Sequence, residues 1–273
     1  RLPLDMQFIF TANPEDYTNR GSIVTPLKDR IGSQILTHYP EDIATAKKIT
    51  HQEANSVKTQ GSAIYVPEIA KDLLEQISFE ARESEYIDAK SGISARMSIT
   101  AYENLLSTAE RRSLLIGEKK TTVRLSDFMG VIPSITGKVE LVYEGEQEGA
   151  GNVALSLIGD AVKTVFNSSF PAIQKLEKQD EKTPYHDTLE WFFAESGFEL
   201  MDEASEKLYT TTLDEVKPLD ELLDTYVPYI PKKDRYFWKE LILWGLVEYN
   251  KLSKSRVDEG YQFKDTFGNY FSN

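Results

Sequence analysis

Apolar residues recur at three- and four-residue spacing through most of the sequence after Pro40, and this spacing most constrains the fold. One apolar face repeating at that interval is typical of amphipathic helices packed on a common core. The predicted helices lie at about 41–57, after Pro67, after Ser94, at 154–166 and at 236–252. Residues 139–142 can form a short strand. The chain is therefore expected to be mainly α.

The residues before Pro40 follow a different pattern. The apolar run Phe8-Ile9-Phe10 predicts a short buried strand over residues 6–12. Asn13-Pro14 ends it, because Pro14 cannot donate to a strand ladder. A polar loop and a helical turn opening at Pro26 follow. A buried strand this close to the first residue needs partner strands that the sequence does not supply, so we expect a fragment of a longer protein.

These patterns divide the chain into residues 1–40, a helical bundle over 41–128 and a mostly helical acidic extension over 129–273. The whole chain carries 31 Lys and Arg against 44 Asp and Glu, a net charge of −13. Residues 177–224 hold 15 of the acidic residues and four lysines. Two interpretations stay open for this segment: a solvent-exposed helical face, or a docking face for a basic partner.

Composition also excludes several classes of protein. The acidic surplus argues against binding nucleic acid or an anionic membrane surface, since both require Lys and Arg. The chain has no cysteine, which excludes disulfides, thiolate metal sites and cysteine nucleophiles, and its three histidines are too scattered to predict a zinc site. It has no run of 18 apolar residues and no signal-peptide pattern, so we expect a cytoplasmic protein.

Two catalytic motifs are missing. The nearest approach to a phosphate-binding Walker loop ends in Gly137-Lys138-Val139, where the spacing is wrong and a valine replaces the hydroxyl that binds magnesium. No Gly-x-Ser-x-Gly nucleophile elbow occurs.

One segment does carry candidate chemistry. A buried strand that ends in the amide of Asn13 suits a nucleotide site in an α/β sheet, where the amide can hold a water against a γ-phosphate. Asp29-Arg30, on a short helix after the loop, can project a guanidinium toward a neighbouring subunit.

These residues resemble the AAA+ ATPases, and within them the ATPase subunit of magnesium chelatase and its MoxR-type relatives. Thr11, Asn13 and Pro14 match the sensor 1 motif, and the segment from Leu27 to Gly32, with Asp29-Arg30-Ile31, matches the arginine-finger motif. Gly92 to Arg96 resembles the start of the sensor 2 helix. The resemblance covers roughly residues 5–128, and the order and spacing of the three motifs carry it.

The resemblance implies a fold and a role for each motif residue. The fold would be the end of an AAA+ α/β core with one short strand, then a helical lid and a helical C-terminal extension. Asn13 would orient the attacking water. Arg30, or Arg20 in its place, would reach the γ-phosphate of the neighbouring subunit. Arg96 would contact the γ-phosphate of its own subunit and couple hydrolysis to lid rotation.

The family's Walker A and Walker B motifs precede sensor 1 and would lie before Arg1. The resemblance therefore implies ATP and Mg²⁺ as cofactors of the longer protein, with neither bound tightly by these residues alone. The longer protein would assemble into a ring and act on a protein partner or a chelatase-type co-subunit. Remodelling of a protein is favoured over metal insertion, because residues 129–273 have no counterpart that we recognise in the metal-inserting subunit.

Structural interpretations remain for each residue. Asn13 can cap a turn, Arg30 can pair with Asp29, and Arg96 can simply face solvent. A non-catalytic helical module for protein–protein interaction is the alternative function, and it would explain the acidic segment and the aromatic helix directly. A Walker loop upstream in the same open reading frame would distinguish the two.

Overall fold

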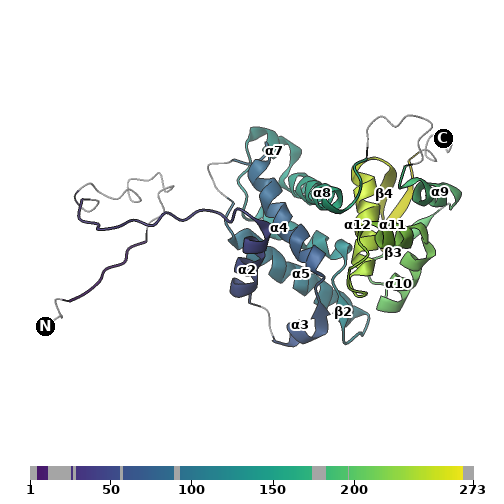
Figure 1. Cartoon of the computed structure of the whole chain (residues 1–273), viewed down its shortest axis with the longest axis horizontal. Coiled ribbons are helices and arrows are strands. Elements are labelled where there is room, and N and C mark those ends of the chain that lie inside the picture. The colour runs from purple at the N-terminus through teal and green to yellow at the C-terminus, as the bar shows by residue number, and fades with distance from the viewer. Residues whose placement is uncertain are drawn as a thin grey trace. The chain divides into compact units, whose positions relative to one another are not determined.

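The computed structural model describes residues 5–11, 26, 29–55, 58–88, 93–173, 183–195 and 197–266. The chain divides into two compact units, Arg1–Tyr39 and Pro40–Asn273, and each is described by itself. Figure 1 traces the elements along the chain.

In the first unit, the prediction of a strand over residues 6–12 is wrong for residues 6–11, the part of it that the structure describes. Residues 5–11 have no regular secondary structure, and Phe8, Ile9 and Phe10 are 68%, 84% and 64% exposed. The rings of Phe8 and Phe10 stack on each other, with centroids 6.2 Å apart. A strand needs a neighbour for its backbone hydrogen bonds, and none of the described residues pairs with this segment. Apolar side chains alone could not supply that neighbour.

The second unit is mainly helical and begins with three helices that the periodicity predicted. They are α2 (Ile43–Glu53), α4 (Glu68–Glu83) and α5 (Arg96–Leu115), with the short α3 (Lys58–Ala63) between the first two. Asp42 caps α2, because its side chain accepts the Thr45 N–H at 2.7 Å. Pro67 is the residue just before α4. α2, α4 and α5 pack against one another.

The next elements extend the same core. They are η1 (Leu125–Val131, a 3₁₀ helix), α6 (Ile132–Thr136), α7 (Tyr143–Glu148), α8 (Ala150–Ser169) and α12 (Arg235–Glu248). α8 packs against both α4 and α12 (Figure 1). One hydrophobic core includes buried side chains from Ile64 to Phe263, so it does not stop at residue 128. The expected strand at 139–142 is reduced to a single bridge between Leu141 and Ile87.

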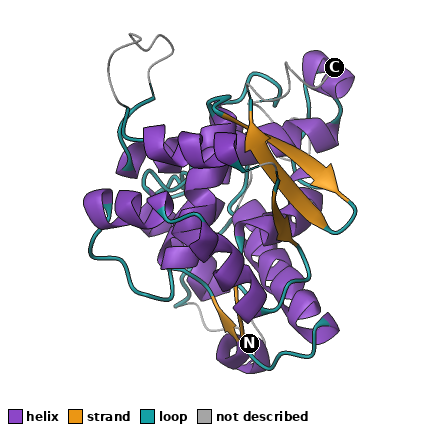
Figure 2. Ribbon diagram, turned by 90° about the vertical axis from the view of Figure 1, so that its right-hand side faces the viewer, coloured by secondary structure: helices purple, strands orange, loops and turns teal. Residues whose placement is uncertain are grey.

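The second unit also holds a small sheet, which the sequence did not predict, within an extension that is otherwise mostly helical as expected. β3 (Phe198–Met201), β5 (Gly260–Asp265) and β4 (Leu252–Val257) lie in that order and are antiparallel. Phe198 pairs with Phe263, and Lys254 pairs with Phe263 from the other side. Figure 2 shows this sheet beside the helices. A second pairing is parallel and very short, between β1 (Ile64–Tyr65) and β2 (Thr121–Thr122).

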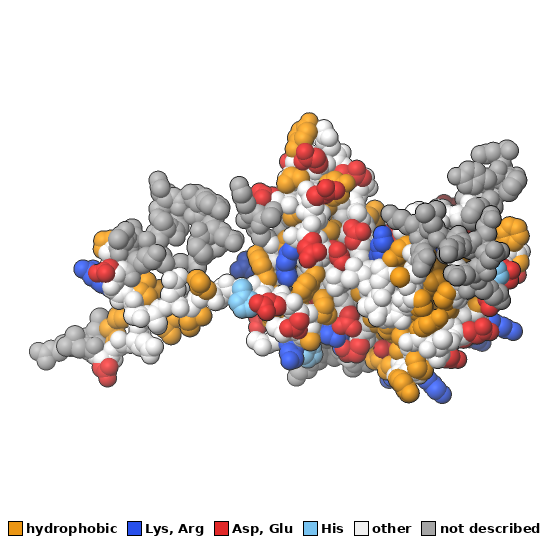
Figure 3. All heavy atoms as spheres, turned by 45° about the horizontal axis from the view of Figure 1, so that its top comes forward, with side chains coloured by type: hydrophobic (Ala, Val, Ile, Leu, Met, Phe, Trp, Pro, Cys, Tyr) orange, Lys and Arg blue, Asp and Glu red, His pale blue; other side chains and the backbone are white. Residues whose placement is uncertain are grey.

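The acidic segment folds into α9 (His186–Ala194), β3, α10 (Glu206–Glu215) and α11 (Pro218–Tyr226). Leu213, Leu219 and Leu223 are buried, whereas no acidic residue that the structure describes between 183 and 224 is buried. On the face drawn in Figure 3, Asp and Glu side chains are scattered among Lys, Arg and apolar ones. The segment therefore faces water, but through three helices and a strand instead of helices alone.

Among the helices of the described residues, none combines the length and the apolar character that crossing a membrane requires.

Candidate functional site

The predicted site residues fall in different parts of the chain. Asn13, and Arg20 as the alternative finger, lie outside the described residues. Arg30 belongs to the first unit, where it is exposed and follows Asp29 in a turn. Arg96 belongs to the second unit. The structure therefore gives the surroundings of Arg30 and Arg96 separately, and the role of each at a γ-phosphate remains a prediction.

Arg96 is the first residue of α5, and its side chain is exposed. Its backbone N–H donates to Ser94 Oγ at 3.2 Å. Ile93 and Met97, on either side, are 3% and 1% exposed, so the start of the helix is anchored in the core. The first turn of a 20-residue helix carries partial positive charge, and its amides suit an anion such as a phosphate. An exposed guanidinium at that point adds a full charge.

Close to this end, α5 is tied to α2 and α4 by buried polar side chains. Ser98 Oγ lies 2.6 Å from Ser78 Oγ, and Thr50 Oγ1 donates to Glu75 Oε1 at 2.5 Å. Burial raises the pKa of the Glu75 carboxyl, although the hydrogen bonds from Thr50 and Ser98 oppose that shift. The three helices are thus joined by specific contacts as well as by apolar packing.

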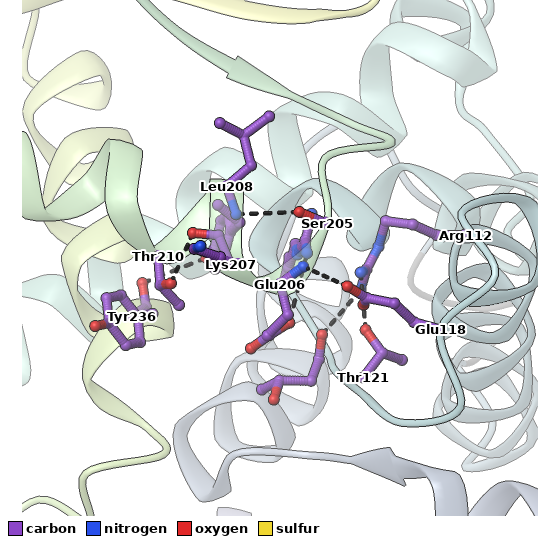
Figure 4. A network of polar contacts seen from close by, with 12 residues as sticks. Arg112, Glu118, Thr121, Ser205, Glu206, Lys207, Leu208, Thr210 and Tyr236 are labelled. Atoms are coloured by element: carbon purple, nitrogen blue, oxygen red, sulfur yellow. Dashed lines mark hydrogen bonds and ion pairs between the residues drawn. The ribbon is translucent and has the colours of Figure 1, made fainter.

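The other end of α5 carries a buried ion pair. Arg112 donates through Nε and Nη2 to the two oxygens of Asp127, at 3.1 and 2.9 Å. Its Nη1 donates to Thr121 Oγ1, and its Nη2 to the Thr122 carbonyl, both at 2.8 Å. Figure 4 shows Arg112 and Thr121 directed at each other. Burial lowers the pKa of the Arg112 guanidinium. The charge and hydrogen bonds of Asp127, together with the nearby Glu206 and Tyr209, outweigh that effect, so the net shift is upward.

A second buried arginine, Arg124, is only partly satisfied. It is 1% exposed, its guanidinium carbon lies 4.2 Å from the centre of the Tyr209 ring, and its Nη2 is 3.5 Å from Glu206 Oε2. Within the described part of the chain, its Nε and Nη1 have no hydrogen-bond partner. Burial and then the nearby Arg112 lower the pKa of Arg124. Beside it, Glu118 accepts the Glu206 N–H at 2.9 Å (Figure 4).

Glu240, on α12, completes this buried polar network. Its carboxylate accepts the backbone N–H of Leu125 at 2.9 Å and of Ser126 at 3.2 Å, and the Tyr209 hydroxyl at 2.8 Å. Burial raises the pKa values of both Glu240 and Tyr209. The network links α5 through η1 to α10 and α12. It therefore joins the segment predicted as a lid to the segment predicted as an extension.

Sequence reasoning missed the members of this network. A signal was present at Lys239-Glu240, where two charges interrupt the apolar and aromatic run of α12. A charge at such a position is buried only when it has partners, and the partners come from elements far away in sequence.

One cluster has the residue types of a metal site. His186, Asp187 and Glu190 of α9 bring one ligand atom each within 4.8 Å of the others. Both carboxylates are exposed, and His186 Nε2 lies 3.0 Å from Glu190 Oε1. Such exposed groups at the start of a helix are common without an ion, and we assign no metal to them.

The comparisons with known proteins add no relative: no family model, no curated protein and no solved structure matches this chain. The resemblance to AAA+ ATPases therefore rests on the motif residues.

Proposed function

We propose that this chain is the sensor and lid part of an AAA+ ATPase similar to the ATPase subunit of magnesium chelatase. The observation that supports it best is the position of Arg96. It opens a 20-residue helix whose first turn is anchored in the core, its guanidinium is exposed, and no described residue forms an ion pair with it. A free cation at a helix N-terminus fits a phosphate.

In the proposed protein, sequence outside these 273 residues supplies the Walker loop and holds Mg²⁺. Arg96 contacts the γ-phosphate of its own subunit. Arg30, which is also exposed, reaches the γ-phosphate of the neighbour, and Asn13 orients the water. Phosphoryl transfer spreads negative charge over the γ-phosphate oxygens, so a supplied arginine accelerates it by about 10³–10⁵-fold.

We propose that ATP hydrolysis drives the remodelling of a protein partner. Support comes from the shared core of α4, α8 and α12 and from the buried network of Arg112, Asp127 and Glu240. Because these contacts join the lid to the C-terminal elements, a rotation of the lid would move both together and transmit force to whatever those elements hold.

The test uses the longer open reading frame, in which we expect a Walker loop upstream. ATP turnover is measured for the longer protein and for Arg96→Ala and Arg30→Ala. Both changes should reduce turnover by at least about 10³-fold. Arg111→Ala is the matched control, since Arg111 lies on the same helix, its side chain is 72% exposed, and it forms an ion pair with Glu203 at 3.8 Å. A frame without a Walker loop, or full turnover by both variants, would contradict the proposal.

A further inference from the structure

A cleft of about 330 Å³ opens between α2, α4 and α5, and the proposed ATPase chemistry uses none of the side chains that line it. The three helices lie together in Figure 1. The volume lies at the lower end of the range for small-molecule sites. It is roughly twice that of a cavity of about 150 Å³ that binds benzene, so a two-ring body would fit.

The α2 wall of the cleft is basic. Ala44, Lys47, Lys48 and His51 follow the spacing of one helix face, and all four line the cleft. An amphipathic helix ordinarily places apolar residues at such positions when it packs on neighbours. Here that face offers cations to a groove, in a protein whose net charge is −13.

The lysines and the histidine that line the cleft differ in whether they already have a partner. Lys47 Nζ lies 2.7 Å from Asp72 Oδ1, and Lys71 pairs with Glu68. Lys48 and His51 are exposed, and no ion pair joins either of them to a residue that the structure describes. These two side chains are therefore available to an anionic group at the mouth of the cleft.

The deeper walls combine apolar side chains with two buried polar ones, Thr50 and Glu75, which are bonded to each other. Leu74 and Glu75 are each 2% exposed, and Tyr102 of α5 is half-buried beside them. The Thr50 hydroxyl donates to Glu75 Oε1 at 2.5 Å, so that carboxyl oxygen already has a partner. The interior thus offers an aliphatic side chain and an aromatic ring to an apolar body.

We propose that this cleft is a binding site for a small aromatic carboxylate, whose head group pairs with Lys48 and His51 and whose rings lie against Leu74 and Tyr102. The complementary charge at the mouth selects an anion, and the apolar interior selects a flat hydrophobic body. The site is independent of the proposed ATPase function, because it contains neither Arg30 nor Arg96.

The experiment titrates the isotope-labelled 273-residue chain with naphthalene-2-carboxylate and follows backbone amide shifts by NMR. Two probes with the same ring system, 2-naphthamide and 2-naphthylmethylamine, are run beside it. We expect saturable shifts in α2 and α4 with a Kd of about 1 mM or tighter. The carboxylate should bind more tightly than the amide, and the amine most weakly. Raising the salt from about 0.05 to about 0.5 M should weaken only the carboxylate.

Variants locate the site. Lys48→Glu should weaken the carboxylate by about threefold to tenfold, whereas Lys138→Glu, at an exposed position on the loop after α6, should not. Ala44→Trp fills the mouth from an exposed position on α2 and should abolish saturation, whereas Ala194→Trp, exposed at the end of α9, should leave it intact. Circular dichroism checks that each variant is folded.

Three results would overturn the proposal: no saturable binding of the carboxylate, tighter binding of the amine, or binding that survives both Lys48→Glu and Ala44→Trp. Saturable binding of an acidic peptide in place of the naphthalene probes would also overturn it, because the site would then be a protein-docking surface.

Discussion

Two neighbouring arginines on α5 show how strongly surroundings change the role of one residue type. Arg112 is 4% exposed, and its guanidinium donates hydrogen bonds to Asp127, Thr121 and the Thr122 carbonyl. Arg111 is 72% exposed and lies 3.8 Å from Glu203. A buried pair is costly to break because the remaining charge is left without solvent or partner. An exposed pair contributes little, since water and salt screen it.

The first prediction compares these two pairs. Asp127→Ala should lower the free energy of unfolding by about 3–5 kcal/mol, because Arg112 would be left buried and unpaired. Arg111→Ala should lower it by less than about 1 kcal/mol. Urea unfolding followed by circular dichroism measures both values. Equal losses for the two variants would show that the Arg112–Asp127 pair contributes no more than a surface contact.

The second prediction concerns Lys254 on β4. Burial lowers the pKa of Lys254 from 10.5 to about 8. The centre of the Trp244 ring lies 3.1 Å from Nζ, and a cation over a ring face is favoured, so this contact opposes the shift. The folded chain therefore releases this proton at lower pH than the unfolded chain does. Its contribution to stability is fully present above pH 10.5 and is lost as the pH falls toward 8.

Lys254→Met should remove this dependence. The difference in unfolding free energy between the wild-type chain and the variant should move in favour of wild type by on the order of 2 kcal/mol between pH 8 and pH 10.5. Chemical unfolding at several pH values measures it. A constant difference across that range would mean that the folded and unfolded chains share one pKa at this position.

At the scale of elements, the crossing of α8 and α12 depends on a glycine. A Cβ added at Gly245 of α12 would lie 2.4 Å from Cδ2 of Phe166, which is fully buried on α8. Real side chains do not approach so closely, so the two helices would have to separate or the ring would have to turn. Gly151, near the start of α8, offers a contrast because a Cβ there would meet nothing within 4 Å.

The third prediction uses this pair of glycines. Gly245→Ala should lower the free energy of unfolding by about 1–3 kcal/mol through overpacking, despite the better helix propensity of alanine. Gly151→Ala should leave it unchanged or raise it by up to about 1 kcal/mol. Thermal or urea unfolding distinguishes them. If Gly245→Ala proved stabilising, the interface between α8 and α12 would be looser than the structure indicates.

For the whole molecule, the fourth prediction is that the 273-residue chain alone turns over no ATP above background. It contains no Walker loop, and without that loop and its lysine the β- and γ-phosphates have no cradle. A coupled phosphate-release assay on the purified chain measures this. Turnover that disappeared in Arg30→Ala would contradict it.

The fifth prediction concerns the ring that we propose for the longer protein. Two inactive forms of the longer protein are mixed, one Arg30→Ala and one with its Walker lysine replaced. Activity should partly recover, because some interfaces then pair an intact Walker loop with an intact Arg30 from the neighbour. A mixture that co-assembles and stays inactive would count against action across the interface, and Arg20 would become the next candidate.

The sequence alone determined the helices, because their signal is local. The spacing of Ile69, Leu73, Leu74 and Ile77 predicts the buried face of α4 without knowledge of what covers it. The same holds for α8 and α12. The net charge can also be counted from the sequence. It favours a solvent-exposed acidic segment, and the described acidic residues of 183–224 do face water. The motif that led to Arg96 was also local, and the structure adds that this residue is exposed at the first turn of α5.

Tertiary structure decided whatever depends on a partner far away along the chain. Phe198 became a strand residue through Phe263, whereas the equally apolar Phe8 did not, because its segment has no neighbour among the described residues. Arg112 and Glu240 can be buried because the fold gives each a partner: Arg112 donates to Asp127, and Glu240 accepts from the Tyr209 hydroxyl. The basic cleft arose where α2, α4 and α5 meet. Hydrogen bonds, ion pairs and cavities are relations between two or more segments, and no single segment of sequence contains them.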